Sequence, residues 1–298
     1  MAAELEAIYR RWAGLDDALA EAKEHIHPDR KDGGADILPL GNTGPVVKQL
    51  RALGRDDGAE EVSTFLDVVI ADPDEKCIAA RLYTQTNAAG PFAEAVGLPT
   101  TGEPFRVFSH ELVWFRDDKV YDILTLIGMN EPPQRLSPSD TISASHRLEL
   151  GTKKLANGEL KSFYHSYIDA INVDLSEAAL ANFVHAEVTH NGQHLSLAQY
   201  VDLISESSSA FDNMIAHVYT VVANEEKQCI AARIEWAGTL VKPLRGVEPN
   251  GRSVQFTEIV FYGLESGKFV RVWSVVDWDM FKAQMMDPVE EQAGNSKK

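Results

Sequence analysis

The chain has 298 residues, of which 44% are hydrophobic and 24% are charged, a composition typical of a soluble globular protein. That length suits two ordinary domains or one large one. Its 45 acidic side chains outnumber 28 basic ones, for a formal net charge of −17. This charge argues against nucleic acid or an anionic membrane surface as a partner.

The cysteine content and the first 25 residues predict a cytoplasmic location. Cys77 and Cys229 are the only cysteines and lie in two similar segments, so each is expected inside its own domain without a disulfide. The N-terminal stretch is charged throughout and lacks the apolar region of a secretory signal. We also expect no membrane span.

The first half of the chain predicts an amphipathic helix followed by antiparallel strands. Apolar residues recur at helical spacing at Leu5, Ile8, Trp12, Leu15 and Leu19, and a short helix is expected over 46–53. Turn dipeptides separate four expected strands, at 62–70, 76–86, 105–115 and 120–127. The stretch NEPPQRLSPSDT at 130–141 predicts a linker, and a helical pattern follows over 148–155.

The second half predicts helices and then a meander of long strands. Helical patterns cover 160–171, 175–183 and 196–205, with a strand expected at 186–190. The meander follows, with strands expected at 213–223, 229–240, 254–264 and 269–277. Turns are expected at Asn191-Gly192, Asn250-Gly251 and Ser266-Gly267.

The two halves repeat one plan. CIAAR occurs at 77–81 and at 229–233, an offset of 152. The segment 101–129 then matches 250–278 without a gap at an offset of 149. So long a period indicates two domains of one fold rather than a solenoid. We expect one domain over 1–130, a linker with a helix over 131–156, and a second domain over 157–298.

The second half resembles the SnoaL-like polyketide cyclases of the NTF2-like superfamily, over about 159–286. The matching pieces are VTHNGQHLSLAQYVDLI, AARIEWAGTL, PLRGVEPNGRSVQFTEI and GKFVRVWSVVDWDMFKAQM. The family pattern that ends in Trp, Asp and Gln is met by Trp273, Asp277 and Gln284, while Val272 stands where the family has His. The first half looks like a degenerate copy.

The resemblance implies an α+β fold of two tandem NTF2-like cones, each a curved antiparallel sheet packed on helices. It further implies that two such sheets pair. Joining the copies by the linker would make that pairing an intramolecular pseudo-dimer, at an effective concentration on the order of mM, and a further homodimer is compatible with it.

Asp277 is the first candidate catalytic residue. With a period of two, Arg271, Trp273, Val275 and Asp277 share one strand face. If that face lines the cone, burial raises the pKa of the carboxyl group and suits it to remove a proton next to a carbonyl. The resemblance implies the same role. The alternative is that Asp277 caps the helix that follows. The aligned position of the first half is Gly128, so that copy lacks the acid.

His190 and Glu258 are the candidate partners of Asp277. A neutral imidazole at His190 could polarise a carbonyl or relay a proton, but a turn histidine bonded to backbone fits equally well. Glu258 alternates with Phe256 and Val260 along one strand face, where a carboxylate is costly unless it is paired or functional. Its alternative is an exposed strand.

Four aromatic residues are candidates for substrate binding: Tyr164, Tyr167, Trp236 and Trp273. Core packing would use the same residue types. The repeated Arg81 and Arg233 favour a structural role, because they recur in the copy without the acid. No Cys, His and carboxylate set has the spacing of a metal site, and no glycine-rich phosphate loop occurs. We expect no metal and no cofactor.

These observations favour a cofactor-independent cyclase or isomerase of secondary metabolism. It would act by general acid–base proton transfer on a small, apolar, polyketide-like carbonyl compound. Two alternatives stay open: a non-catalytic ligand-binding or scaffold protein, since a fold does not fix a function, and a hydrolase or dehydratase on the same cone.

Overall fold

The computed structural model describes residues 2–13, 26–29, 63–87, 104–128, 134–135 and 153–286. It is an α+β structure with two sheets, in which the strands are antiparallel apart from one neighbouring pair in the larger sheet. The helices expected at 46–53 and over most of 148–155 lie outside the described residues; residues 153–156 have no regular secondary structure.

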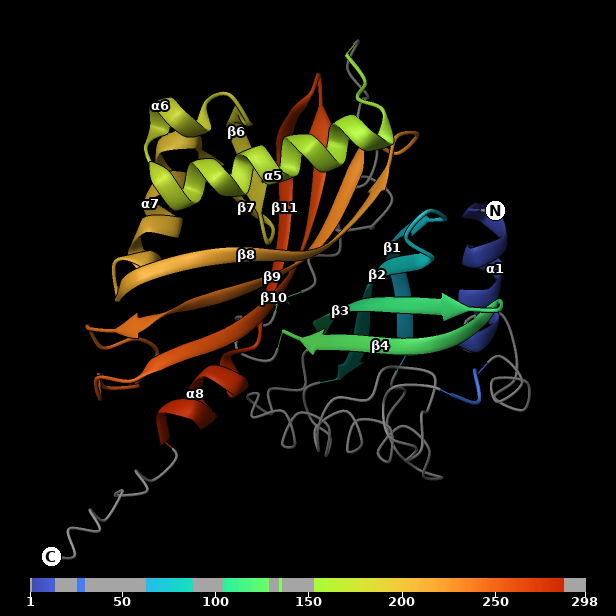
Figure 1. The fold of residues 1–298 in the computed structure, drawn as a ribbon, viewed down its shortest axis with the longest axis horizontal. Helices are drawn as coiled ribbons and strands as arrows, with labels where there is room; N and C mark the ends of the chain where they lie inside the picture. Colours follow the sequence, from blue (N-terminus) through green and yellow to red (C-terminus); the bar gives the residue numbers. More distant parts are fainter. Residues whose placement is uncertain are drawn as a thin grey trace, which may run out of the picture.

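Among its described residues, the N-terminal unit has helix α1 packed on a sheet in the order β1-β2-β3-β4 (Figure 1), and β5 pairs with β3. Its elements are α1 (Ala2–Trp12), β1 (Ser63–Asp72), β2 (Cys77–Asn87), β3 (Pro104–Arg116), β4 (Lys119–Ile127) and β5 (Gln134–Arg135). Leu5, Ile8 and Tyr9 are buried between α1 and the sheet. The apolar spacing near the N-terminus therefore marks the helix face that packs on the strands.

The C-terminal unit is a six-stranded sheet in the order β7-β6-β11-β10-β9-β8, in which β6 runs parallel to β11. Its helices are α5 (Asn157–Val173), α6 (Glu177–Leu180), α7 (Leu197–Ser208) and α8 (Trp278–Met286). Its strands are β6 (Val184–His190), β7 (Gln193–Ser196), β8 (Phe211–Asn224), β9 (Cys229–Leu240), β10 (Ser253–Glu265) and β11 (Lys268–Val276).

Local chemistry sets the ends of these elements. At the start of α7 the Ser196 hydroxyl accepts from the Gln199 backbone N–H (3.2 Å), while the Gln199 side chain accepts from the Ser196 N–H (2.9 Å). This capping box satisfies two N–H groups that a helix start leaves open. In the β10–β11 hairpin, Ser266 and Gly267 have φ values of 49° and 79°. Positive φ at both central residues is what a tight two-residue hairpin needs.

The two sheets have equivalent registers. The last pair between β1 and β2 is Asp72–Cys77, and the last pair between β8 and β9 is Asn224–Cys229, an offset of 152 for both partners. β3–β4 and β10–β11 pair with a constant offset of 149, and bulges recur at equivalent places in the first and third strands. The strand plan of the two halves is therefore the same; common descent by duplication stays a prediction.

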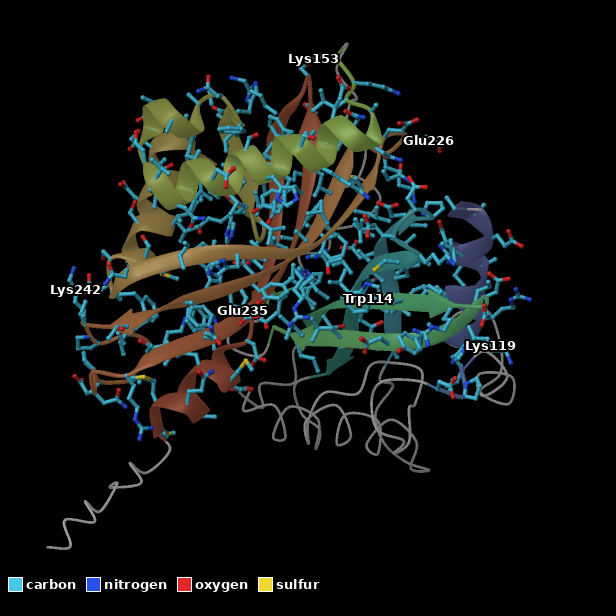
Figure 2. All side chains as sticks on the ribbon, viewed as in Figure 1. Trp114, Lys119, Lys153, Glu226, Glu235 and Lys242 are labelled. Atoms are coloured by element: carbon cyan, nitrogen blue, oxygen red, sulfur yellow. The ribbon has the colours of Figure 1, made fainter. Side chains whose placement is uncertain are left out.

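The C-terminal sheet is covered on both faces. Its inner face carries α5, α6 and α7 over a large buried cluster (Figure 1). Its outer face meets the N-terminal sheet in a second buried cluster, and Figure 2 shows Trp114 in that region. The members of this interface cluster are Ile70, Cys77, Ala79, Leu112 and Leu126 from one sheet and Val222, Cys229, Ala231, Ile259, Phe261 and Val275 from the other. Each of the five residues from the N-terminal sheet has its repeat equivalent among the six from the C-terminal sheet.

Candidate functional site

The inner face of the C-terminal sheet collects four buried tyrosines. Tyr164 and Tyr167 come from α5, Tyr200 from α7 and Tyr262 from β10. The hydroxyls of Tyr167 and Tyr200 are 2.9 Å apart. Burial, the largest cause, raises the pKa of all four well above that of a free tyrosine. Their hydroxyls are therefore neutral hydrogen-bond donors at physiological pH.

Glu258 on β10 places a carboxyl group against this tyrosine cluster. The Trp236 indole N–H donates to Glu258 Oε2 at 2.6 Å, and the Ser274 hydroxyl donates to Oε1 through a short contact. Burial raises the pKa of the Glu258 carboxyl, while the hydrogen bonds from Ser274 and Trp236 oppose the rise. The charge of Glu258 in turn raises the pKa of Tyr164, after burial. Glu258 is thus a fixed acid with a raised pKa.

Ser274 is itself held by an asparagine at the end of β6. The Asn191 side chain accepts from the Ser274 backbone N–H (2.9 Å) and donates to the Ser274 carbonyl (3.0 Å). β6 ends at His190, so the Asn191 side chain takes the place of a further backbone partner for β11. The contact fixes the strand from which the Ser274 hydroxyl reaches Glu258.

His190 lies beside the tyrosine cluster. Its ring centroid is 6.0 Å from that of Tyr200, and its backbone pairs with Val272 on β11. Burial lowers the pKa of the imidazole to about 4, so His190 is neutral near pH 7. A neutral imidazole can donate one hydrogen bond and accept another without carrying charge into the site.

Asp277 lies at the start of α8, where its carboxylate accepts from the Met280 backbone N–H at 2.8 Å. This is the contact of a helix N-cap. The side chain is half-buried, and burial raises the pKa of the carboxyl group while the Met280 hydrogen bond opposes the rise. The structure therefore gives Asp277 a capping contact, and its catalytic role stays a proposal.

The expected placement of Trp273 is wrong. Trp273 and Val275 lie on the outer face, packed in the interface cluster against the N-terminal sheet. The inner-face residues of β11 are Val272, which packs in the tyrosine cluster, and Ser274, which meets Glu258. Trp273 therefore shapes the interface between the sheets rather than the inner face. Trp236, by contrast, lies on the inner face as expected.

The sequence interpretation missed Tyr200, Tyr262 and Ser274 as neighbours of Glu258. The period of two from Glu258 through Val260 to Tyr262 marks a single face, and Tyr200 lies on the apolar face of its helix. Ser274 had no sequence signal, because its contact depends on the β10–β11 register. Within the described ranges, no group of three or more His, Cys, Asp or Glu side chains could hold a metal ion.

A surface groove lies away from these residues. A groove of about 430 Å³ runs beside α5, lined by Leu155, Gly158, Glu159, Ser162, Phe163, Ser166 and Phe183. None of the predicted site residues lines it. Among the described helices, none is both long and apolar enough to cross a membrane.

Residues 159–285 match the family model of the SnoaL-like polyketide cyclases. A solved SnoaL-like polyketide cyclase from Agrobacterium tumefaciens is 31% identical over 42% of this chain and 96% of its own, with a TM-score of 0.39. Over this segment the chain is similar to the SnoaL-like polyketide cyclases.

Two further solved structures are similar over 42% and 44% of the chain. IdmH from Streptomyces antibioticus, a putative polyketide cyclase, is 19% identical over 42% of this chain and 97% of its own, with a TM-score of 0.38. AclR from Streptomyces galilaeus, a putative hydroxylase, is 21% identical over 44% and 86%, with a TM-score of 0.39. No curated protein matches the chain.

Two residues of the pattern quoted for the SnoaL-like family hold α8 in place. Asp277 caps the helix, and the Gln284 side chain accepts from the Gln255 backbone N–H (3.0 Å) and donates to the Gln255 carbonyl (2.5 Å). Gln284 therefore ties the end of α8 to β10. In this SnoaL-like segment the conspicuous Asp and Gln contact the polypeptide itself.

Proposed function

We propose that the C-terminal unit catalyses proton transfer on a small, largely apolar carbonyl compound, leading to aldol cyclisation or isomerisation. The observation that carries this proposal is the Glu258 carboxyl group, with its raised pKa and its two fixed donors, Trp236 and Ser274. A carboxyl group whose pKa is raised toward the working pH is both a better base and a usable acid. The match of residues 159–285 to the SnoaL-like family model supports the same class of reaction.

The proposed step begins when the Glu258 carboxylate removes a proton from the carbon next to the substrate carbonyl. The C–H electron pair moves to the carbonyl oxygen, giving an enolate. The Tyr164 hydroxyl, buried in the tyrosine cluster beside Tyr262 and close enough to Glu258 to feel its charge, is the proposed donor to that oxygen. The enolate carbon attacks a second carbonyl of the same molecule, and protonated Glu258 returns its proton to the alkoxide formed.

His190 and Asp277 have secondary roles in this proposal. His190 would orient the carbonyl as a neutral donor, because burial keeps its imidazole uncharged. Asp277, which follows the strand residue paired with Glu258, is the alternative base. The aromatic residues Trp236, Tyr164 and Tyr167 would enclose the substrate. The reaction draws on acid–base groups of the chain itself.

Deuterium exchange tests the proposal without a known natural substrate. Full-length protein is incubated in D₂O with a panel of uncharged cyclic and linear β-diketones, and ¹H NMR follows loss of the α-proton. We expect catalysed exchange that Glu258→Gln lowers by roughly 10²–10⁴-fold, the usual contribution of a general base. Full exchange in Glu258→Gln, with loss in Asp277→Asn, would move the role of base to Asp277.

A binding function is the second candidate, favoured by the capping contact of Asp277 and by Val272 in the place of the family's His. In that case the β-diketones of the panel bind to the protein, but their α-protons are not exchanged. For the whole chain, we propose a cytoplasmic protein in which the first copy, which has Gly128 in place of the acid, serves as the structural half of a pseudo-dimer. A further homodimer is compatible with that arrangement.

A further inference from the structure

The N-terminal sheet contacts the C-terminal sheet directly behind Glu258. His110 on β3 is buried, and its Nδ1 lies 2.7 Å from the backbone carbonyl oxygen of Ile259, the residue after Glu258. A carbonyl oxygen only accepts, so His110 Nδ1 carries the hydrogen and donates it. The His110 ring also packs edge-on against Phe261, with 4.9 Å between ring centroids.

A second contact between the two sheets, a cation–π contact, comes from the neighbouring strand β2. The Arg81 guanidinium lies 3.8 Å from the ring centroid of Phe108 and 5.2 Å from that of Trp273 on β11. Arg81 also forms a buried ion pair with Asp67, and it is the cross-strand neighbour of His110. Trp273 precedes Ser274, the residue whose hydroxyl donates to Glu258.

The two contacts are made to β10 and β11, the strands that carry Glu258 and Ser274. Successive residues of a strand point to opposite faces, so Glu258 and Ser274 face the tyrosine cluster while Ile259 and Trp273 face the N-terminal sheet. A functional side chain is placed precisely only when the backbone beneath it is held by further contacts. His110 and Arg81 supply such contacts from the rear of β10 and β11.

At the contact between His110 and Ile259, the two halves of the chain carry different residues at equivalent positions. His110 and Ile259 are equivalent positions, 149 residues apart, and the two sheets pack through equivalent positions elsewhere in the interface cluster. In two identical sheets the same residue would stand on both sides. Here the N-terminal sheet carries the donor, and the sheet with Glu258 carries the acceptor.

We propose that His110 and Arg81 are positioning residues for Glu258, so that the N-terminal unit acts as a built-in support for the candidate site of the C-terminal unit. The inference rests on the proposed role of Glu258. It assigns the N-terminal unit a function beyond burying apolar surface. Neither residue touches the substrate; each acts through the strand that it holds.

The test follows the hydrogen bond between Trp236 and Glu258 and does not require a substrate. In ¹⁵N-labelled full-length protein, the Trp236 indole N–H resonance is followed against pH, with Glu258→Gln identifying the transition that belongs to Glu258. The titratable groups facing Glu258 are Tyr164, Tyr200 and Tyr262, which stay neutral, and His190 lies beside Tyr200.

His110→Leu removes the donor, and we expect the midpoint of this transition to rise by about half a pH unit or more, roughly a threefold change in the protonation equilibrium. The cause is a poorer alignment of Trp236 and Ser274 on the ionised carboxylate. His110→Asn keeps an N–H near the place of Nδ1 and should restore the midpoint. Trp273→Leu, which leaves the Arg81–Asp67 pair intact, should also raise it.

Ile70→Ala is the matched control, since Ile70 is fully buried in the same interface cluster but belongs to β1. It should lower stability without moving the midpoint. An unchanged midpoint in His110→Leu, or an equal shift in Ile70→Ala, would overturn the positioning role. If His110→Leu does not fold, an unchanged midpoint in Trp273→Leu is decisive against it. Loss of turnover in Glu258→Gln is a separate result that decides the proposed function.

Discussion

Replacing Trp236 by Phe removes the indole donor of Glu258, and the effect on stability should depend on pH. A hydrogen bond to a charged group contributes about 1.5–3 kcal/mol, and one to a neutral group about 0.5–1.5 kcal/mol. The donor–acceptor distance of 2.6 Å is shorter than that of an ordinary N–H···O bond, and hydrogen bonds to ionised groups are the shorter ones. Trp236→Phe should therefore cost about 1–1.5 kcal/mol more where Glu258 is ionised than where it is protonated.

The direction in which stability changes with pH follows from the raised pKa of Glu258. Because burial raises the pKa of Glu258 in the folded state, its contribution to the free energy of unfolding is full below the unfolded pKa and is lost as pH rises through the folded pKa. Losing the Trp236 donor raises that folded pKa further, by roughly one unit. The stability of the variant should thus fall more steeply than that of the wild type as pH rises.

Urea unfolding followed by far-UV circular dichroism, at about pH 4 and about pH 8, measures this difference. The lost packing of the larger indole ring costs the same at both pH values, so it cancels. Trp278→Phe is the matched control, since Trp278 packs on Phe256 and Phe281 in the α8 cluster. An equal loss of stability at both pH values in Trp236→Phe would refute the contact with an ionised carboxylate.

Burial holds the folded pKa of His190 at about 4. Protonation of His190 should therefore lower the free energy of unfolding by roughly 2–3 kcal/mol as pH falls from about 6.5 toward 4, and His190→Gln should flatten this pH dependence in urea titrations. Asp277→Ala should cost about 0.5–2 kcal/mol as a lost helix cap, whereas Asp277→Asn should be near neutral at about pH 7, because its amide oxygen still accepts from Met280; equal losses in both variants would count against the cap. Gln228→Leu should cost about 1–3 kcal/mol, because the buried Gln228 side chain accepts from the Leu155 N–H (2.9 Å) and donates to the Leu155 carbonyl (2.8 Å); hydrogen exchange at Leu155 should rise with it.

The strands and their order could be predicted because local signals are strong in both halves. Turn dipeptides such as Ser266-Gly267 take the positive φ values that hairpins require. Apolar spacing located α5, α7 and the long strands to within a few residues. The constant offsets of the repeat, read from the sequence alone, reappear as equivalent strand registers.

The face of β11 could not be predicted from its pattern. Periodicity shows which residues share a face, but Val272 and Trp273 are both apolar, because this sheet is packed on its inner and its outer side. With no polar face to mark solvent, the pattern does not say which side holds the tyrosines. Trp273 was therefore assigned to the wrong side, and Ser274 was overlooked.

The importance of Glu258 relative to Asp277 also depended on tertiary contacts. Both carboxylates stand among apolar residues in the sequence. Only the fold shows that Glu258 receives Trp236 and Ser274, which come from two neighbouring strands, while Asp277 receives a backbone N–H of its own helix. Contacts across strands set the chemistry of this site, and no local pattern encodes them.

The pKa of Glu258 in the intact protein tests the central claim most directly. Protein labelled with ¹³C at the glutamate carboxyl carbon is titrated by NMR, and comparison with Glu258→Gln assigns the resonance. The account predicts a midpoint clearly above about 4.3, the value of an exposed glutamate. A midpoint at or below that value would contradict the account, because Glu258 would then be an ordinary carboxylate.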